Sequence, residues 1–436
     1  MRAFSENITP DSFSGAIFAV EGIQDSCAIL NGPTGCKFYH SAISDSQFPR
    51  NFGRNSPVFR GEFYFGMPRV PATYLDGNDY VFSGREKLER LLHLAAGQGH
   101  GLIAVVNSPG AALIGDDLRG FLERSVQGTP CVALETAGFS GTFGAGYQRA
   151  LAAAVDVLAG PPDAPGTARR AGTVNLLGLG IYQRYYEGNR HALERLLGLC
   201  GVEVLAVPGA GDNAASFARL GQAALNVAVY PEYGAALAEK LRAHFGTPAL
   251  IPEEGPPVGF DALEGFLRQV CAALDADPAP ALERVEQARA RAYRFLARFT
   301  TMLGFPKGAL FSVKAEASTA YALTRWLSSY LGMIPQAISL NDEGESPFVP
   351  RLRAFLNSIN RGGALTSSLI TSPCHLLFAD ANTIAALRLE GQRFCGIEIA
   401  MPSLSYVDVT EKSFLGEWGA LFLLEQILNG LRYVLP

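Results

Sequence analysis

The stretch around Cys36 contains the residues best suited to chemistry. It reads Leu30-Asn31-Gly32-Pro33-Thr34-Gly35-Cys36-Lys37-Phe38-Tyr39-His40. Two glycines and a proline before the cysteine favour a tight turn that lets a bound group approach the backbone. Such a turn can present a thiolate and several N–H groups to an anionic iron–sulfur cluster. A buried loop cysteine is the alternative interpretation, and His40 could tune a bound metal through a hydrogen bond or be a plain surface residue.

The other six cysteines are scattered and form no CxxC pair; they are Cys27, Cys131, Cys200, Cys271, Cys374 and Cys395. The odd total of seven argues against a disulfide framework. Without a CxxC pair, a self-contained zinc or ferredoxin-type site is not expected. Cys131, Cys200, Cys271 and Cys395 fall in strand or helix patterns and are expected in the core. Any metal site must therefore combine isolated cysteines through the fold or through another chain.

Other short motifs carry less information. Cys374-His375 follows an expected strand, and strand ends in α/β sheets are places where ligands bind, although a lone pair is more often packing. Gly178-Leu179-Gly180 resembles part of a dinucleotide loop without its third glycine, so no NAD site is inferred. The chain has no GxxxxGK[ST] loop, so an ATP-using step would belong to another protein.

Length and composition limit the class of protein. The chain has 436 residues, 48% of them hydrophobic, so two or three domains are expected. The net charge is −5 and no long basic run occurs, so no nucleic-acid partner is expected. Its apolar runs are much shorter than the roughly 20 residues of a membrane-spanning helix. Residues 1–7 contain an acid and no apolar core, unlike a secretory signal, so a cytoplasmic location is expected.

After about residue 100, β-rich runs alternate with helical patterns. Strands are expected at 102–107, 131–135, 173–177, 203–207, 225–229, 309–313, 337–340, 366–370 and 394–400. Helices are expected at 117–126, 147–158, 190–199, 214–221, 233–244, 317–331, 349–359, 382–389 and 418–431. This alternation is typical of parallel sheets built from βαβ units. The irregular part between 51 and 79 is typical of a functional segment or a partner contact.

Two breaks divide the pattern into three parts. A Pro- and Gly-rich seam at 160–166 marks the first break, and a charged helical stretch at 280–300 precedes the second. We expect an N-terminal domain at 1–165, a middle domain with its connecting helix at 166–299 and a C-terminal domain at 300–436. The expected fold class is α/β, with three doubly wound Rossmann-like domains built on parallel sheets.

Segments along nearly the whole chain resemble, in order, the nitrogenase component 1 family. The Cys36 turn is similar to the family's cluster-binding turn. Residues 79–88, 113–118, 226–235 and 416–429 resemble its Val-Phe-Gly-Gly, Ile-Gly-Asp-Asp, Pro-Glu-Tyr-Gly and last-helix segments. The family includes the molybdenum–iron protein, its assembly scaffold, the protochlorophyllide and chlorophyllide reductases, the nickel-sirohydrochlorin cyclase and methylthio-alkane reductase. The resemblance implies an oxidoreductase with a component 1-like fold.

The resemblance also implies a cluster that this chain holds in part. The richest cluster sites of the family take three cysteines per subunit, and Cys36 matches the middle one. Asp11 stands where the first would lie, and the segment 107–110 stands where the third would lie. A cubane needs about four ligands, so a [4Fe–4S] or larger P-cluster-type centre would take the others from a partner. A second copy could also contribute, with Asp11 or Cys27 as the extra ligand, but Asp11 also suits a helix N-cap and Cys27 the core.

Partners and substrate follow from the same resemblance. Tyr230 and Leu415 stand near the places of the cysteine and histidine that hold the nitrogenase cofactor, so the chain resembles a companion, beta-type subunit. A homologous subunit in an α2β2 heterotetramer (or a homodimer) and an ATP-dependent homodimeric iron protein are the expected partners. Gly32 and Gly35 would let the backbone approach the cluster, and the loop 115–117 would pack near it. Carbon–sulfur cleavage and tetrapyrrole reduction are the candidate reactions on a small-molecule substrate.

Two other classes of function stay open at this point. An assembly scaffold would carry a cofactor precursor without turnover. A small-molecule binding protein of stacked α/β domains would use Cys36 only as a structural thiol. Iron analysis separates the binding protein from the first two, and ATP-dependent turnover separates the enzyme from the scaffold.

Overall fold

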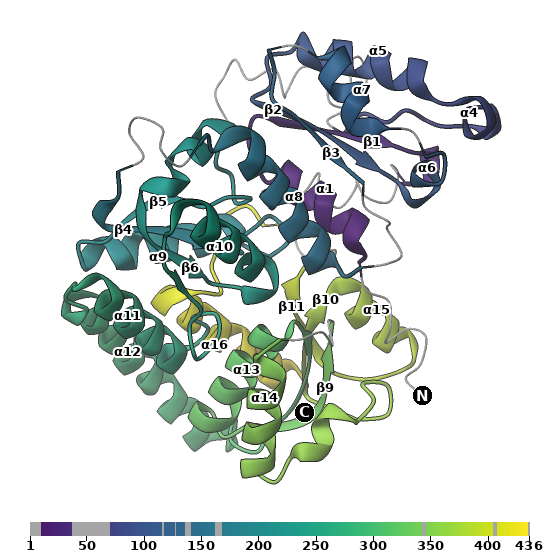
Figure 1. Ribbon diagram of the computed structural model, residues 1–436. Coiled ribbons are helices and arrows are strands. Elements are labelled where there is room, and N and C mark those ends of the chain that lie inside the picture. Colours follow the sequence, from purple (N-terminus) through teal and green to yellow (C-terminus); the bar gives the residue numbers. More distant parts are fainter. Residues whose placement is uncertain are drawn as a thin grey trace.

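Three parallel β-sheets with helices packed against them form the structure (Figure 1). The computed structural model describes residues 10–36, 70–115, 117–126, 128–135, 141–161, 168–341, 346–403 and 408–434. Within these ranges, no helix has both the length and the apolar character needed to cross a lipid bilayer. Each sheet falls inside one of the three proposed domains. The expected α/β class with parallel, Rossmann-like sheets is confirmed.

The first sheet has the strand order β1-β2-β3. Its strands are β1 (Ser26–Asn31), β2 (Leu102–Asn107) and β3 (Cys131–Leu134). One face carries α1 (Ser12–Glu21) and α8 (Phe143–Leu158), and the other carries α5 (Arg85–Ala96) and α7 (Leu118–Ser125). Alternate side chains of β1 point to opposite faces of the sheet. Ala28 and Leu30 pack in the core on the α1 side, and Cys27 and Ile29 pack in the core on the α5 side. Two short helices, α4 (Gly77–Phe82) and α6 (Pro109–Ala112), stand near the carboxyl ends of these strands.

The second and third sheets have the orders β5-β4-β6-β7 and β11-β10-β8-β9. The second consists of β4 (Arg170–Leu177), β5 (Glu203–Ala206), β6 (Ala223–Ala228) and β7 (Ala249–Leu250). The third consists of β8 (Leu310–Ala315), β9 (Ile334–Leu340), β10 (Leu376–Asp380) and β11 (Cys395–Ala400). The strand order reverses between β4 and β6 and between β8 and β10. Such switch points are where open α/β sheets place ligands.

Helices link these strands and join the two sheets. In the second sheet, the helices that follow β4, β5, β6 and β7 are, in that order, α9 (Tyr186–Leu199), η3 (Ala214–Gln222), α10 (Pro231–Phe245) and α11 (Phe260–Leu274). The connecting helix is α12 (Ala279–Leu303). In the third sheet, β8 is followed by α13 (Ala317–Arg325) and the π-helix η4 (Trp326–Tyr330), and β9 by α14 (Phe348–Ser358) and η5 (Gly362–Leu365). Helix α15 (Ala381–Leu389) follows β10, and α16 (Gly416–Val434) follows β11. Helix α16 packs against α9, α11 and α12 as well as β11, so it ties the third sheet to the second.

Helices α1 and α8 lie side by side between the first sheet and the other two (Figure 1). Glycines allow this close contact. A Cβ added at Gly146 would lie 1.9 Å from the carbonyl oxygen of Ser12, and one added at Gly15 would lie 2.0 Å from that of Phe143. Any larger residue at these two positions would push the helices apart.

One expected strand is wrong. Residues 366–370 follow η5 as a turn, and the strand of this region is β10, a few residues later. The hydroxyls of Thr366 and Ser367 both donate to the carbonyl oxygen of Gly363, at 3.0 Å. Such local bonds between side chain and backbone compete with strand pairing, which explains the difference. Strand β1 and helix α5, in the first hundred residues, were not expected either.

Candidate functional site

The Cys36 turn begins at the carboxyl end of β1 and is held from two sides. On one side, the segment leading into α4 runs beside it, and the Leu75 N–H donates to the carbonyl of Gly32 at 3.0 Å. On the other side, the Ser108 N–H donates to the carbonyl of Asn31 at 2.9 Å. Neighbours that are distant in sequence therefore fix the backbone of this turn.

A small amide network stands at the base of the turn. Asn31 and Asn107 end β1 and β2 in register, and Nδ2 of Asn31 donates to Oδ1 of Asn107 at 2.8 Å. The Thr73 hydroxyl donates to Oδ1 of Asn31 at 2.9 Å and accepts the Gly32 N–H at 3.0 Å. The adjoining cavity of about 20 Å³, lined in part by Asn31, Asn107 and Leu88, has room for about one water molecule. The network positions the turn.

Cys36 and Asp11 lie within electrostatic range of each other. Burial, followed by the negative charge of Asp11, raises the pKa of the Cys36 thiol, which is half-buried. Asp11 is the N-cap of α1, as one interpretation of the sequence predicted: its Oδ1 accepts the Ser14 N–H at 3.0 Å and the Ser14 hydroxyl at 2.8 Å. No described residue donates a hydrogen bond to Oδ2 of Asp11. That oxygen can therefore serve a ligand while the helix cap stays intact.

The glycines of the predicted site differ in their surroundings. A Cβ added at Gly32 would lie 2.6 Å from the Ser108 hydroxyl oxygen, so glycine permits the close approach of the two turns. No described atom lies within 4 Å of a Cβ built at Gly35, so packing does not explain this glycine. Gly115 has a φ of +76°, which favours glycine, and Asp117 caps α7 through the Gly120 N–H at 3.0 Å. Asp116, predicted with them, lies outside the described residues.

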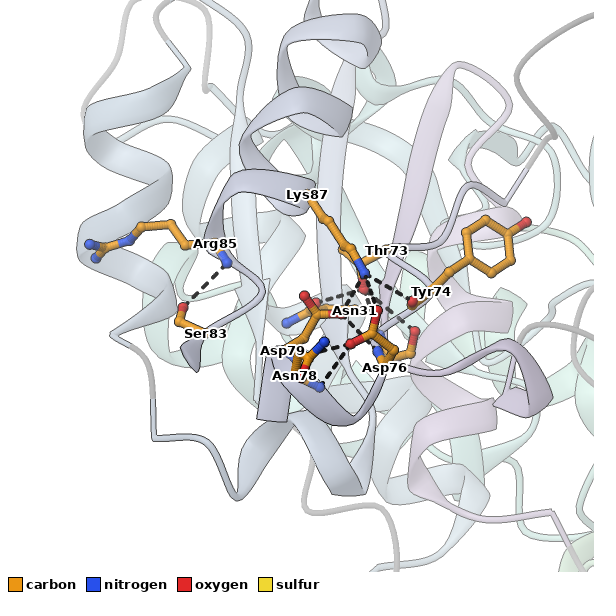
Figure 2. Close-up of polar contacts among 10 residues, drawn as sticks. Asn31, Thr73, Tyr74, Asp76, Asn78, Asp79, Ser83, Arg85 and Lys87 are labelled. Carbon is orange, nitrogen blue, oxygen red and sulfur yellow. Dashed lines mark hydrogen bonds and ion pairs between the residues drawn. The ribbon is translucent and has the colours of Figure 1, made fainter. Parts of the chain in front are cut away.

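Helix α4 is fixed beside the turn by a capping box and an ion-pair cluster (Figure 2). Oδ2 of Asp79 accepts the Asp76 N–H at 2.7 Å, and Oδ1 of Asp76 accepts the Asp79 N–H at 3.3 Å. The Lys87 ammonium lies 3.1 Å from the Asp76 carboxylate and 2.5 Å from that of Asp79. The flanking residues Tyr74 and Ser83 have φ values of +52° and +78°, which are uncommon for residues other than glycine. Backbone strain of this kind often marks a functional element.

The outer side of α4 presents apolar side chains to solvent. Val81 is 72% exposed and Phe82 is 80% exposed, and Leu113, just after α6, is 89% exposed. Tyr80 connects the two helices: a Cβ added at Gly110 of α6 would lie 2.8 Å from the Tyr80 hydroxyl oxygen. We call Tyr80, Val81, Phe82 and Leu113 the α4 surface. Large exposed apolar patches are typical of interaction sites.

The centre of the molecule is closed by aromatic packing. Rings from α1, α8, α10 and the turn after β4 meet there: Phe18, Phe143, Tyr147, Tyr182 and Tyr233, all buried. The ring centroids of Phe143 and Tyr182 are 4.0 Å apart, and those of Tyr147 and Tyr233 are 5.7 Å apart. Rings therefore occupy the space at the switch point of the second sheet.

The partial dinucleotide loop after β4 is filled by Tyr147. The Tyr147 hydroxyl donates to the carbonyl of Leu179 at 3.1 Å. A Cβ added at Gly180 would lie 2.1 Å from that hydroxyl oxygen. The two residues near the cofactor-ligand places, Tyr230 and Leu415, are both buried within the hydrophobic core. Core side chains therefore fill the region after β4 and around Tyr230 and Leu415.

The carboxyl edges of the second and third sheets are joined by hydrogen bonds. The Tyr233 hydroxyl donates to Oε1 of Glu316 at 2.5 Å. The Glu232 carboxylate accepts the N–H of Ser318 at 2.8 Å and its hydroxyl at 2.6 Å. Burial raises the pKa of Glu232 and, together with the nearby Glu316 charge, that of Tyr233. These contacts join the second and third sheets at their carboxyl edges.

The remaining cysteines are placed largely as expected. Cys27, Cys200 and Cys271 are buried, and Cys131 and Cys395 are half-buried against core residues. Burial raises the pKa of Cys27 to about 12 and that of Cys131 to about 11, which disfavours their thiolates.

The Cys374-His375 pair is placed differently from the expectation. It stands at the amino end of β10, because residues 366–370 are not a strand. Nδ1 of His375 accepts the Leu310 N–H at 2.9 Å, and Cys374 is packed in a hydrophobic cluster. His40, the other histidine singled out from the sequence, lies outside the described residues.

The donors near Cys36 fit part of an iron–sulfur site. Thiolate is the usual ligand of such clusters, and a carboxylate oxygen is a harder alternative. Within the described part of the chain, no three His, Cys, Asp or Glu side chains are grouped so that they could hold a metal ion. Cys36 and Asp11 together supply two donors, fewer than the roughly four that a cubane takes. The remaining donors would have to come from outside these residues.

Comparison with known proteins agrees with the resemblance seen in the sequence. The chain is 32% identical over 177 residues to the B-type subunit of the light-independent protochlorophyllide reductase of Rhodospirillum rubrum, a match covering 39% of this chain and 32% of that protein. The match thus spans about a third of that relative's length. The chain is 23% identical over 456 residues to the nitrogenase molybdenum-iron protein beta chain of Frankia alni, covering 95% of this chain and 80% of that protein.

The fold and the family model extend over nearly the whole chain. A solved structure of nitrogenase Cp1 at pH 6.5 superimposes with a TM-score of 0.77 at 16% identity, covering 98% of this chain and 93% of that one. A second, nitrogenase Cp1 at pH 5, gives a TM-score of 0.68 at 18% identity, covering 99% of this chain and 90% of that one. The family model of nitrogenase component 1 type oxidoreductases matches residues 12–432. This chain therefore belongs to the family of nitrogenase component 1 type oxidoreductases.

Proposed function

We propose that this chain is the companion, beta-type subunit of a nitrogenase-like two-component reductase, and that Cys36 anchors an iron–sulfur cluster at the interface with a homologous subunit. The observation that carries the proposal is a half-buried thiol on a fixed turn at the carboxyl end of the first sheet, with a carboxylate in electrostatic range. The described residues supply too few other donors to complete a metal site. The names of the two relatives, one a B-type subunit and the other a beta chain, support the companion role.

The ligand set follows from the donors present. Sγ of Cys36 is the first ligand, and Oδ2 of Asp11 is the second candidate because its helix cap uses Oδ1. The homologous subunit would supply the remaining ligands of a [4Fe–4S] cluster, or most of those of a larger P-cluster-type centre. Gly32 lets the turn pack onto Ser108, which keeps the Cys36 backbone in place. The bound cluster would supply one-electron transfer, and this chain's residues would hold and orient it.

The α4 surface is the proposed docking area for the ATP-dependent iron protein. Val81, Phe82 and Leu113 are exposed apolar residues. The segment leading into α4 is bonded to the Cys36 turn through Leu75 and Gly32. The capping box and Lys87 fix α4 in place. Docking would therefore immobilise few additional side chains and lose little conformational entropy. Electrons would enter the cluster that Cys36 anchors. The assembly would be an α2β2 heterotetramer, or a homodimer if a second copy replaces the homologous subunit.

The substrate is proposed to bind mainly on the homologous subunit. The aromatic packing around Tyr147 and Tyr182 fills the corresponding region of this chain. Similarity to a protochlorophyllide reductase favours a tetrapyrrole as the substrate class, with reductive carbon–sulfur cleavage as the second candidate.

The test is anaerobic purification of this chain with its co-expressed homologous subunit. Iron and sulfide analysis and visible absorption are measured first, and ATP-dependent turnover is then measured with the iron protein, dithionite and either a protochlorophyllide or an alkyl thioether. We expect iron, sulfide and turnover that requires ATP. A metal-free, colourless complex would contradict the cluster, and an intact cluster without turnover of either substrate would favour an assembly scaffold.

A further inference from the structure

Tyr80 stands between the ends of two neighbouring strands. Its hydroxyl packs on Gly110 of α6, just after β2, where an added Cβ would lie 2.8 Å from the hydroxyl oxygen and 3.3 Å from the ring. Helix α6 packs in turn on the turn after β1: the Ser108 N–H donates to the carbonyl of Asn31 at 2.9 Å, and a Cβ added at Gly32 would lie 2.6 Å from the Ser108 hydroxyl oxygen. The Cys36 thiol is also near enough to act electrostatically on Tyr80. Tyr80 therefore contacts the segment after β2 that packs against the Cys36 turn.

The Tyr80 hydroxyl is available as a hydrogen-bond donor. It forms no hydrogen bond with any described residue, and the side chain is 37% exposed. A phenol has a pKa of about 10 and keeps its proton at neutral pH, so the O–H can donate to an anionic acceptor. The position is also rigid, because Asp76 and Asp79 form the capping box of α4 and Lys87 pairs with both.

We propose that the Tyr80 hydroxyl donates a hydrogen bond to the iron–sulfur cluster anchored on Cys36 and thereby raises the reduction potential of that cluster. This inference rests on the proposed function. No hydrogen bond joins Tyr80 to Cys36 itself, but a cluster extends beyond the cysteine sulfur that holds it. Hydrogen bonds to cluster sulfurs help to set the reduction potential. Because the reduced cluster is more negative, a donor stabilises it more than the oxidised one.

The test compares Tyr80→Phe with wild type in the anaerobic complex with the homologous subunit. The substitution removes one oxygen atom and leaves the ring on Gly110, so iron content should not change. The midpoint potential, followed by electron paramagnetic resonance during redox titration, should shift to more negative values. Pulsed resonance in D2O should lose one exchangeable deuteron coupling. A structural role alone would not move that coupling.

Two matched variants serve as controls. Tyr74→Phe removes a hydroxyl from the segment before α4, and Tyr433→Phe removes one from the exposed end of α16. Both should keep the wild-type potential and deuteron coupling. An unchanged potential and coupling in Tyr80→Phe, with normal iron content, would overturn the role of Tyr80 and leave the proposed function standing. A wild-type complex without iron would instead overturn the proposed function.

Discussion

The carboxyl edge of the first sheet differs from those of the second and third sheets in what fills it. At the first edge, Cys36 is half-buried on a turn fixed by amides and small residues, and Phe82 nearby faces solvent. At the other two edges, rings such as Tyr147 and Tyr182 pack together, and Tyr233 bonds Glu316 across the gap. The backbone topology permits ligands at such edges in general. Side chains therefore decide which edge is open to chemistry.

The closed edge can be tested by removing one of its rings. Tyr147→Ala should lower the free energy of unfolding by about 3–5 kcal/mol, because the side chain is 1% exposed and would leave a cavity. Tyr147→Phe keeps the ring and loses only the hydrogen bond to Leu179, at a cost of about 1 kcal/mol. Urea unfolding curves measure both. If the alanine variant were as stable as wild type, the centre would not be the packed region described above.

The open edge can be tested at the α4 surface. Phe82→Asp should lower the rate of ATP-dependent electron delivery by about tenfold at limiting iron protein, equivalent to ~1.4 kcal/mol of docking free energy. Iron content should stay normal, since Phe82 is 80% exposed and holds no metal. Leu389→Asp, at an equally exposed apolar position on α15, is the control and should have no effect. Equal rates for both variants would place the docking area elsewhere.

A smaller effect concerns the acidity of the Cys36 thiol. Burial and the Asp11 charge raise the pKa of Cys36, so its thiolate fraction at pH 8 is low and rises about tenfold per pH unit below that pKa. Asp11→Asn removes the charge and keeps a good N-cap residue. In the metal-free chain, the pKa of Cys36 should fall, and alkylation by iodoacetamide at pH 8 should become a few times faster. Peptide mapping isolates this cysteine, and the half-buried Cys395 serves as the internal control. A slower or unchanged rate at Cys36 would contradict the electrostatic interaction with Asp11.

Much of the fold could be predicted because its signals are local. The alternation of strands and helices after residue 100 follows from hydrophobic periodicity, and the strand expected at 225–229 lies close to β6 (Ala223–Ala228). The helix cap at Asp11 was also readable, because an N-cap depends on residues three positions apart. The strand expected at 366–370 failed because Thr366 and Ser367 bond locally to Gly363.

The surroundings of the site could not be predicted, because they depend on contacts between distant segments. The pairing of Asn31 with Asn107 requires the register of β1 and β2, although two asparagines at strand ends were a usable signal. The contact of Tyr80 with Gly110 depends on where α4 folds back. The sequence thus indicates which thiol to consider, and the tertiary structure supplies its neighbours.

The most direct measurement is the iron content of the anaerobic complex carrying Cys36→Ala, compared with one carrying Cys271→Ser. Cys271 is a fully buried thiol of the core and serves as the matched control. We expect the Cys36 variant to lose the cluster and its visible absorption, while the Cys271 variant keeps both. Unchanged iron in the Cys36 variant would contradict the central claim that this thiol anchors the cluster.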